Sequence, residues 1–116
     1  MSYYENQQCI EACMECAAAC NHCAMECTKE ENIQMMAKCI QSDMACAVAC
    51  NAAGQLITFE SSAVEEMCAL CAKLCDECAE ECARHEHLDH CKRCAIICRH
   101  CAEECRKMTT KELSFI

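Results

Sequence analysis

The spacing of the cysteines constrains the fold of this chain more than any other feature of its sequence. Nineteen of the 116 residues are cysteine, and they occur in four groups. In three groups successive cysteines alternate between steps of three and four residues, while the sparser group of Cys39, Cys46 and Cys50 fits the same register. Such steps place every cysteine of a group on one stripe of an α-helix, the a/d seam of a bundle. The spacing therefore predicts four helices, each with one cysteine-lined face.

The sequence between the cysteines is that of an all-α chain. It has no proline and one glycine, and the intervening Ala, Glu and Met residues favour helix. Short connections between helices favour antiparallel neighbours. We predict one domain over residues 1–116, an antiparallel up-down-up-down four-helix bundle with a cysteine-lined core. The helices are placed near residues 4–27, 30–53, 62–83 and 87–108, followed by a tail over 109–116.

Polar residues and the glycine predict where the helices begin and end. A Ser or Thr followed three residues later by Glu is typical of a capping box, in which two side chains satisfy free backbone amides. Three such pairs occur before predicted helices: Ser2 with Glu5, Thr28 with Glu31, and Ser62 with Glu65. Gly54 is expected to end the second helix, because glycine adopts the left-handed conformation found after many helices.

Charge and hydropathy exclude several classes of protein. The net charge is −9 and no Lys or Arg cluster is present, which excludes nucleic acid and anionic membranes as partners. No apolar run approaches the roughly 20 residues of a membrane-spanning helix. The N-terminus has no basic patch followed by an apolar stretch, as a signal peptide would. We therefore expect a cytoplasmic protein, and a cysteine-rich chain in that reducing compartment indicates metal binding or redox chemistry.

Three interpretations without metal fit the cysteines less well. Cysteine can serve as a small buried hydrophobe, but here it occupies almost every seam position. Disulfides have narrow geometry and are reduced in the cytosol. Thiol redox catalysis needs one or two exposed cysteines of low pKa, not a continuous buried column. Metal binding by a protein that is not an enzyme is the favoured interpretation.

The chemistry of a filled thiolate core favours copper. Thiolates select Cu(I), zinc or iron–sulfur clusters, and ferredoxin-type cysteine runs usually include a proline that this chain lacks. A Zn(Cys)4 site would carry a charge of about −2 in a core of low dielectric. Each Cu(I) instead replaces one thiol proton, so the core stays neutral at any loading. Two sulfurs per ion and two ions per sulfur predict roughly one Cu(I) per cysteine.

The repeated C-x3-C-x2-C-x3-C pattern, which extends from Cys9 to Cys105, closely resembles the cytosolic branch of the bacterial copper storage proteins. The resemblance implies a pre-folded bundle that stores many Cu(I) ions along its axis, usually as a homotetramer. Candidate partners are copper ions, other copies of the chain, and a copper chaperone or a copper-requiring enzyme. Two alternatives remain open: a zinc- or cadmium-sequestering protein of metallothionein type, and a copper chaperone or sensor.

The candidate metal ligands lie on the seam. They are the nineteen cysteines together with Met36, Asp43 and His87: Cys9, Cys13, Cys16, Cys20, Cys23, Cys27, Cys39, Cys46, Cys50, Cys68, Cys71, Cys75, Cys78, Cys82, Cys91, Cys94, Cys98, Cys101 and Cys105. Copper is expected to enter at the end of the bundle that holds His87 and Met36. Asp43 either assists metal binding or is hydrogen bonded within the structure.

The seam register also places the other histidines and the far end of the bundle. We expect His22, His90 and His100 to face mostly outward, with His90 beside the seam. An apolar plug is expected at the end opposite His87. Its members would be Leu56, Ile57, Phe59, Val64, Leu113, Phe115 and Ile116.

Overall fold

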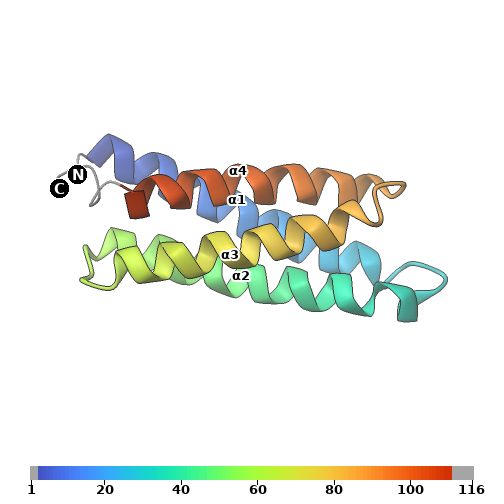
Figure 1. Ribbon diagram of the computed structural model, residues 1–116. Coiled ribbons are helices and arrows are strands. Elements are labelled where there is room, and N and C mark those ends of the chain that lie inside the picture. The colour runs from blue at the N-terminus through green and yellow to red at the C-terminus, as the bar shows by residue number, and fades with distance from the viewer. Residues whose placement is uncertain (1–2, 111–116) are drawn as a thin grey trace.

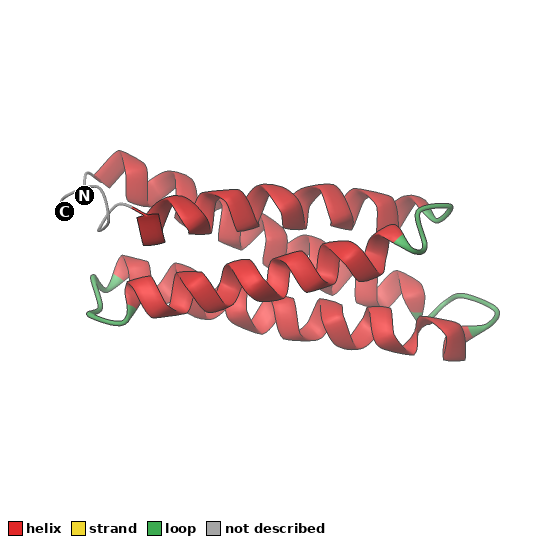
Figure 2. Ribbon diagram, in the orientation of Figure 1, coloured by secondary structure: helices red, strands yellow, loops and turns green. Residues whose placement is uncertain are grey.

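The computed structural model describes residues 3–110, and these residues form helices joined by short loops and turns, without strands (Figure 2). None of the described helices combines the length and the apolar character needed to cross a bilayer. The elements in chain order are α1 (Tyr3–Cys27), the short 3-10 helix η1 (Ile33–Met36), α2 (Ala37–Thr58), α3 (Val64–Ala83) and α4 (Asp89–Thr110).

The four α-helices lie side by side along the length of the molecule (Figure 1). Each helix packs against the next in the chain, and α1 also packs against α4, which closes the ring. The molecule measures 51 × 23 × 19 Å. The α1–α2 and α3–α4 connections, residues 28–36 and 84–88, lie at one end, which we call the histidine end; the α2–α3 turn lies at the other. The predicted antiparallel up-down-up-down bundle is confirmed.

The core is built from cysteine and alanine. All nineteen cysteines have at most 1% of their surface exposed. Buried alanines such as Ala17, Ala47 and Ala102 pack between them, and Met36, Ile57 and Met108 are larger apolar side chains in the same core. Small side chains let the helices approach closely, so a chain with few Leu, Ile, Val or Phe residues still forms a dry interior. The predicted cysteine-lined core is confirmed.

The connection between α1 and α2 differs from the prediction. The second helix begins at Ala37 instead of near residue 30, because a turn and η1 come first. Thr28 does not start a capping box: its hydroxyl donates to the carbonyl of Met25 at 2.6 Å and so completes the last turn of α1. The capping box at Ser62 is also wrong, since Ala63 occupies the N-cap of α3 without a side-chain cap. Ser2 lies outside the described residues.

The end of α2 differs as well. Gly54 does not end the helix, which continues to Thr58, and the glycine is buried where an added Cβ would lie 2.5 Å from Cε of Met14. Glu60 takes the left-handed position instead, with φ of 53°. The amides of Glu60 and Ser61 bond the carbonyls of Ile57 and Leu56, both at 3.0 Å. This is a Schellman motif with glutamate where glycine is usual.

Candidate metal centre

The cysteine sulfurs form a continuous column along the axis of the bundle. Sulfurs from different helices approach closely: Sγ of Cys46 on α2 lies 3.5 Å from Sγ of Cys75 on α3. Cys39 of α2 and Cys82 of α3 are 3.7 Å apart, measured between the same atoms. These distances are short enough for two sulfurs to bind one ion after small side-chain movements.

Neighbouring sulfurs on the same helix add to the column. Residues four apart on an α-helix lie one above the other on the same face. Six cysteine pairs of this kind have sulfurs 3.8 to 4.0 Å apart: Cys16–Cys20, Cys23–Cys27, Cys46–Cys50, Cys71–Cys75, Cys78–Cys82 and Cys94–Cys98. The C-x3-C spacing of the sequence therefore supplies two sulfurs to one point on the axis.

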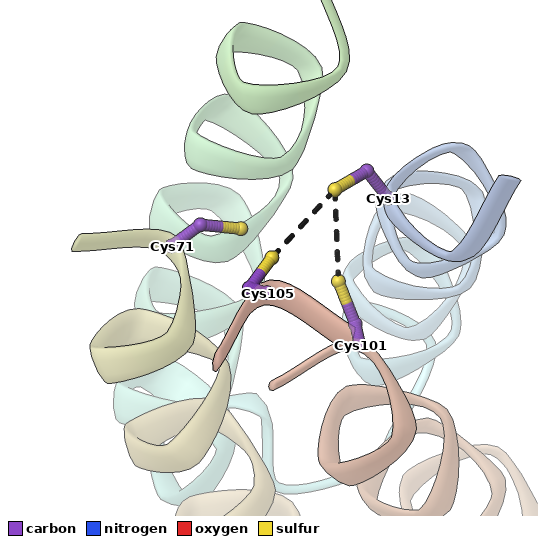
Figure 3. A group of neighbouring side chains, drawn as sticks. All are labelled: Cys13, Cys71, Cys101 and Cys105. Carbon is purple, nitrogen blue, oxygen red and sulfur yellow. Dashed lines mark hydrogen bonds between the residues drawn. The ribbon is translucent and has the colours of Figure 1, made fainter. Parts of the chain in front are cut away.

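Sulfurs from several helices come together in groups of four. In the group of Figure 3, Cys13 of α1 faces Cys71 of α3 and Cys101 and Cys105 of α4, and all four sulfurs lie within 4.8 Å of one another. Three further groups consist of Cys16, Cys46, Cys50 and Cys75; of Cys16, Cys20, Cys46 and Cys98; and of Cys20, Cys78, Cys94 and Cys98. The last three groups share Cys16, Cys20, Cys46 and Cys98 among them and so form a chain of linked sites.

The cysteines of the column are free thiols. The shortest sulfur–sulfur distance given above, 3.5 Å, is far longer than the roughly 2 Å of a disulfide. Burial raises the pKa of Cys27 to about 12, and burial likewise raises the pKa of Cys91. These thiols are neutral near pH 7, so an incoming cation must displace their protons.

Asp43 lies among the sulfurs with 0% of its surface exposed. Its Oδ1 accepts hydrogen bonds from the thiols of Cys78 at 3.1 Å and of Cys82 and Cys94 at 3.5 Å. Burial, with the nearby sulfur of Cys94 as the second cause, raises the pKa of the Asp43 carboxyl to about 8. Of the two roles expected for Asp43, the structure thus shows the hydrogen-bonded one. It also places the carboxyl group beside the sulfurs of candidate metal ligands.

At the histidine end, the structure brings His90 to the sulfurs. Its Nε2 lies 3.5 Å from Sγ of Cys27, and His90 forms a mixed group with Cys23, Cys27 and Cys91 in which the ligand atoms lie within 4.8 Å of one another. His90 is half-buried, so the expectation that it faces mostly outward is wrong. A sequence signal for this contact exists: His90 directly precedes Cys91, one position from the seam.

The predicted entry residues lie at this same end. His87 is exposed in the turn between α3 and α4, and its ring centroid is 6.5 Å from that of His85. Met36 is buried, with 4% exposed, at the start of α2. His22 and His100 are exposed on α1 and α4.

The opposite end is only partly the expected plug. Ile57 is 2% exposed and Met108 is 6% exposed, and both belong to the buried core. Leu56 and Val64 are half-buried. Phe59, in contrast, is 71% exposed and takes no part in a plug, because α2 ends just before it. The remaining expected members lie outside the described residues: Leu113, Phe115 and Ile116.

Comparison with known proteins points to one family. Residues 2–110 match the model of the family described as "Copper storage protein". The chain is 44% identical over 86 residues to the uncharacterized cysteine-rich protein YhjQ of Bacillus subtilis (strain 168), an alignment covering 74% of this chain and 79% of that protein.

Solved structures give the same result. The Cu(I)-bound copper storage protein BsCsp3 is 42% identical, with a TM-score of 0.86 over 90% of this chain and 98% of that one. A cytosolic copper storage protein from Streptomyces lividans is 34% identical in a structure of copper loading with five coppers. The TM-score is 0.89, and the match covers 92% of this chain and 93% of that one.

Proposed function

This chain belongs to the copper storage protein family, and on that premise we propose that it stores many Cu(I) ions on thiolates inside a preformed bundle. The observation that carries the proposal is the overlap of the four-sulfur groups, in which Cys16 and Cys20 each belong to two. A sulfur that belongs to two groups can bridge two neighbouring ions as a thiolate. Every ion is cargo in this scheme, and no residue acts as a catalyst.

The proposed capacity is roughly one Cu(I) per cysteine, with all nineteen cysteines as ligands. Each ion needs only two or three sulfurs, and both C-x3-C pairs and pairs between helices supply them. The thiols lose one proton for each ion gained, so the dry interior acquires no net charge as it fills.

The same geometry disfavours zinc. Structural zinc takes four ligands in a tetrahedron, so the nineteen cysteines would hold far fewer zinc ions than Cu(I) ions. A core filled with Zn(Cys)4 units would also accumulate negative charge away from water, which is costly. BsCsp3, with which this chain shares 42% of its residues, is Cu(I)-bound.

We propose that copper enters at the histidine end. His87 is exposed there, and His90 contacts Cys27 at 3.5 Å, so the two imidazoles define a path from solvent to the first sulfurs. Met36 is buried at the start of α2, three residues before Cys39, and its thioether is assigned to the same path. Asp43 lies deeper and offers a carboxylate oxygen to ions bound by Cys78, Cys82 or Cys94.

The entry path is tested by loading kinetics. His87→Ala and His90→Ala should each slow copper transfer from a chelated Cu(I) donor without lowering the final copper content. His100→Ala, which changes an exposed histidine on α4, is the matched control. Uptake and release at wild-type rates in both His87→Ala and His90→Ala would contradict entry at this end.

We place the protein in the cytosol, the location given for the Streptomyces lividans relative, and propose a homotetramer. Apolar side chains on the outside of the helices offer surface for self-association: Met14, Met44, Val48, Leu70 and Ile96 are 42 to 69% exposed. A copper chaperone or a copper-requiring enzyme would exchange copper with the assembly. Sedimentation equilibrium of the reduced protein measures the oligomeric state, and a monomer would contradict the tetramer.

Copper K-edge X-ray absorption of the loaded protein tests the storage proposal itself. We expect sulfur as the dominant scatterer, two to three sulfurs around each ion on average, and a second shell of copper neighbours from shared thiolates. Copper surrounded mainly by nitrogen, or without neighbouring copper, would contradict storage in linked thiolate sites.

A further inference from the structure

A second buried carboxylate, Glu81, lies at the histidine end. It is the third residue from the end of α3, and its side chain is 7% exposed. Its Oε2 lies 3.2 Å from Nε2 of His85, and its Oε1 accepts a hydrogen bond of 3.1 Å from Nη1 of Arg84. Nζ of Lys38 on α2 is 3.9 Å away. Glu81 therefore connects α2, α3 and the α3–α4 turn.

The contact with His85 fixes the chemistry of that imidazole. A carboxylate oxygen accepts hydrogen bonds, so Nε2 of His85 is the donor in this contact and carries the proton. In the neutral ring Nδ1 then holds the free lone pair. The His85 side chain is only 13% exposed, so the ring is held in place by its surroundings.

Nδ1 of His85 remains available. Within residues 3–110, His85 forms a ring hydrogen bond through Nε2 and none through Nδ1. The ring of His87 is 6.5 Å away between centroids. Two imidazoles that share one linearly bound ion would have centroids roughly 6 Å apart, with metal–nitrogen bonds of about 2 Å.

We propose that Glu81 is a positioning residue for copper uptake: it holds His85 as the Nε2–H tautomer and so presents Nδ1 toward ions entering beside His87. This inference rests on the proposed entry at the histidine end. It assigns no metal contact to Glu81 itself. A carboxylate that accepts a hydrogen bond from a ligand histidine orients the ring and strengthens its other nitrogen as a donor.

A purely structural role for Glu81 explains less. Arg84 and Lys38 are 65% and 69% exposed, and ion pairs with such exposed partners contribute little stability. The shielded partner is His85. A carboxylate kept away from water needs strong hydrogen bonds. The hydrogen bond from the imidazole meets this need and also fixes the tautomer of His85, a potential copper ligand.

Nitrogen-15 NMR of the reduced, metal-free protein tests the tautomer directly. Long-range proton–nitrogen spectra should show His85 protonated at Nε2 in the wild type. Glu81→Gln keeps an oxygen acceptor and should preserve this pattern, whereas Glu81→Ala should give a mixture of tautomers. A wild-type pattern in Glu81→Ala, or His85 protonated at Nδ1 in the wild type, would overturn the proposal.

Stopped-flow transfer from Cu(I)–bathocuproine disulfonate tests the consequence. Glu81→Ala should slow the first phase of uptake about tenfold, the lower range for loss of a residue that orients a ligand. Glu81→Gln and the exposed neighbour Glu80→Ala are controls and should load near the wild-type rate. In a His85→Ala background, Glu81→Ala should slow uptake no further; an equal slowing with and without His85 would show a structural role and overturn the proposal.

The final copper content separates this inference from the storage proposal. Glu81→Ala should reach the same number of ions per chain as the wild type, because no thiolate is lost. If the wild type itself saturates at a few ions, storage fails, while the NMR result still decides whether Glu81 sets the tautomer of His85.

Discussion

The thiol of Cys78 donates a hydrogen bond of 3.1 Å to Oδ1 of the Asp43 carboxyl group, none of whose surface is exposed. Cys82 and Cys94 donate to the same oxygen at 3.5 Å. Asp43 thus interrupts the sulfur column with an acceptor on which three thiols converge. Neutral thiols are weak donors, so they compensate only part of the cost of burying a charge there.

The stability of the metal-free protein should therefore fall with rising pH because of Asp43. Burial raises the pKa of this carboxyl from its ordinary 3.8 to about 8. Between those values the folded chain keeps a proton that the unfolded chain has released, so stability is greatest at low pH and decreases up to about pH 8. The slope from this group is at most about 1.4 kcal/mol per pH unit.

Urea unfolding of the reduced protein between pH 5 and 8 measures this slope, with Asp43→Asn as the comparison. The asparagine has a similar shape and does not ionise, so the variant should lose this part of the pH dependence and be more stable than the wild type near pH 8. Equal pH dependence in the two proteins would show that Asp43 is ionised in the fold.

Replacing Glu60 by glycine should stabilise the fold. Glu60 has φ of 53° at the end of α2, a left-handed conformation that costs a residue with a Cβ about 1 kcal/mol. Glu60→Gly should raise the free energy of unfolding by about that amount, measured by urea titration of the reduced protein. Glu60→Ala keeps the Cβ and should stay near the wild type; a loss of stability in Glu60→Gly would contradict the turn geometry.

Gly54→Ala should be neutral or mildly stabilising despite the close approach of Met14. Alanine improves helix propensity by about 1 kcal/mol, and the atom that the new Cβ meets is the terminal Cε of Met14. That side chain is 42% exposed and can move aside. Thermal unfolding of Gly54→Ala and of Gly54→Ala with Met14→Ala measures the effect. A loss of more than about 2 kcal/mol would mean that α1 and α2 cannot adjust.

Cys75→Ser should lower the copper capacity and leave the bundle folded. The Cys75 sulfur lies 3.5 to 4.0 Å from those of four other cysteines, Cys16, Cys46, Cys50 and Cys71. Losing this bridging thiolate should remove about one Cu(I) per chain. Native mass spectrometry of the loaded protein counts the ions.

The matched control for this change is Ala72→Ser, which adds a hydroxyl at a buried position of the same helix without removing a ligand. It should bind as many ions as the wild type. An unchanged ion count in Cys75→Ser would place the copper away from this part of the column.

Much of the fold follows from spacing alone. Steps of three and four residues put the cysteines on one face of each helix, and the structure buries all nineteen. The helix ends are harder to predict, because they depend on hydrogen bonds and packing that the cysteine spacing does not encode. Gly54 lies inside α2, where it packs against Met14 of α1, and Thr28 bonds backward to Met25 instead of forward into the next helix.

The histidine end shows the same limit. The predicted seam register includes His87, but α4 begins at Asp89, so helical periodicity does not place a residue in the turn before it. His90 lies inside the helix and approaches Cys27. The contact between Glu81 and His85 also depends on how the turn folds back onto α3, which the cysteine pattern does not encode.

Anaerobic titration of the reduced protein with Cu(I), against a competing chelator and with circular dichroism recorded throughout, tests copper storage most directly. We expect full helicity before metal is added and tight binding of roughly one Cu(I) per cysteine. Saturation at about one to four ions, as for a copper chaperone or sensor, would contradict storage in the sulfur column. Helicity that forms only as copper is added would contradict a preformed bundle.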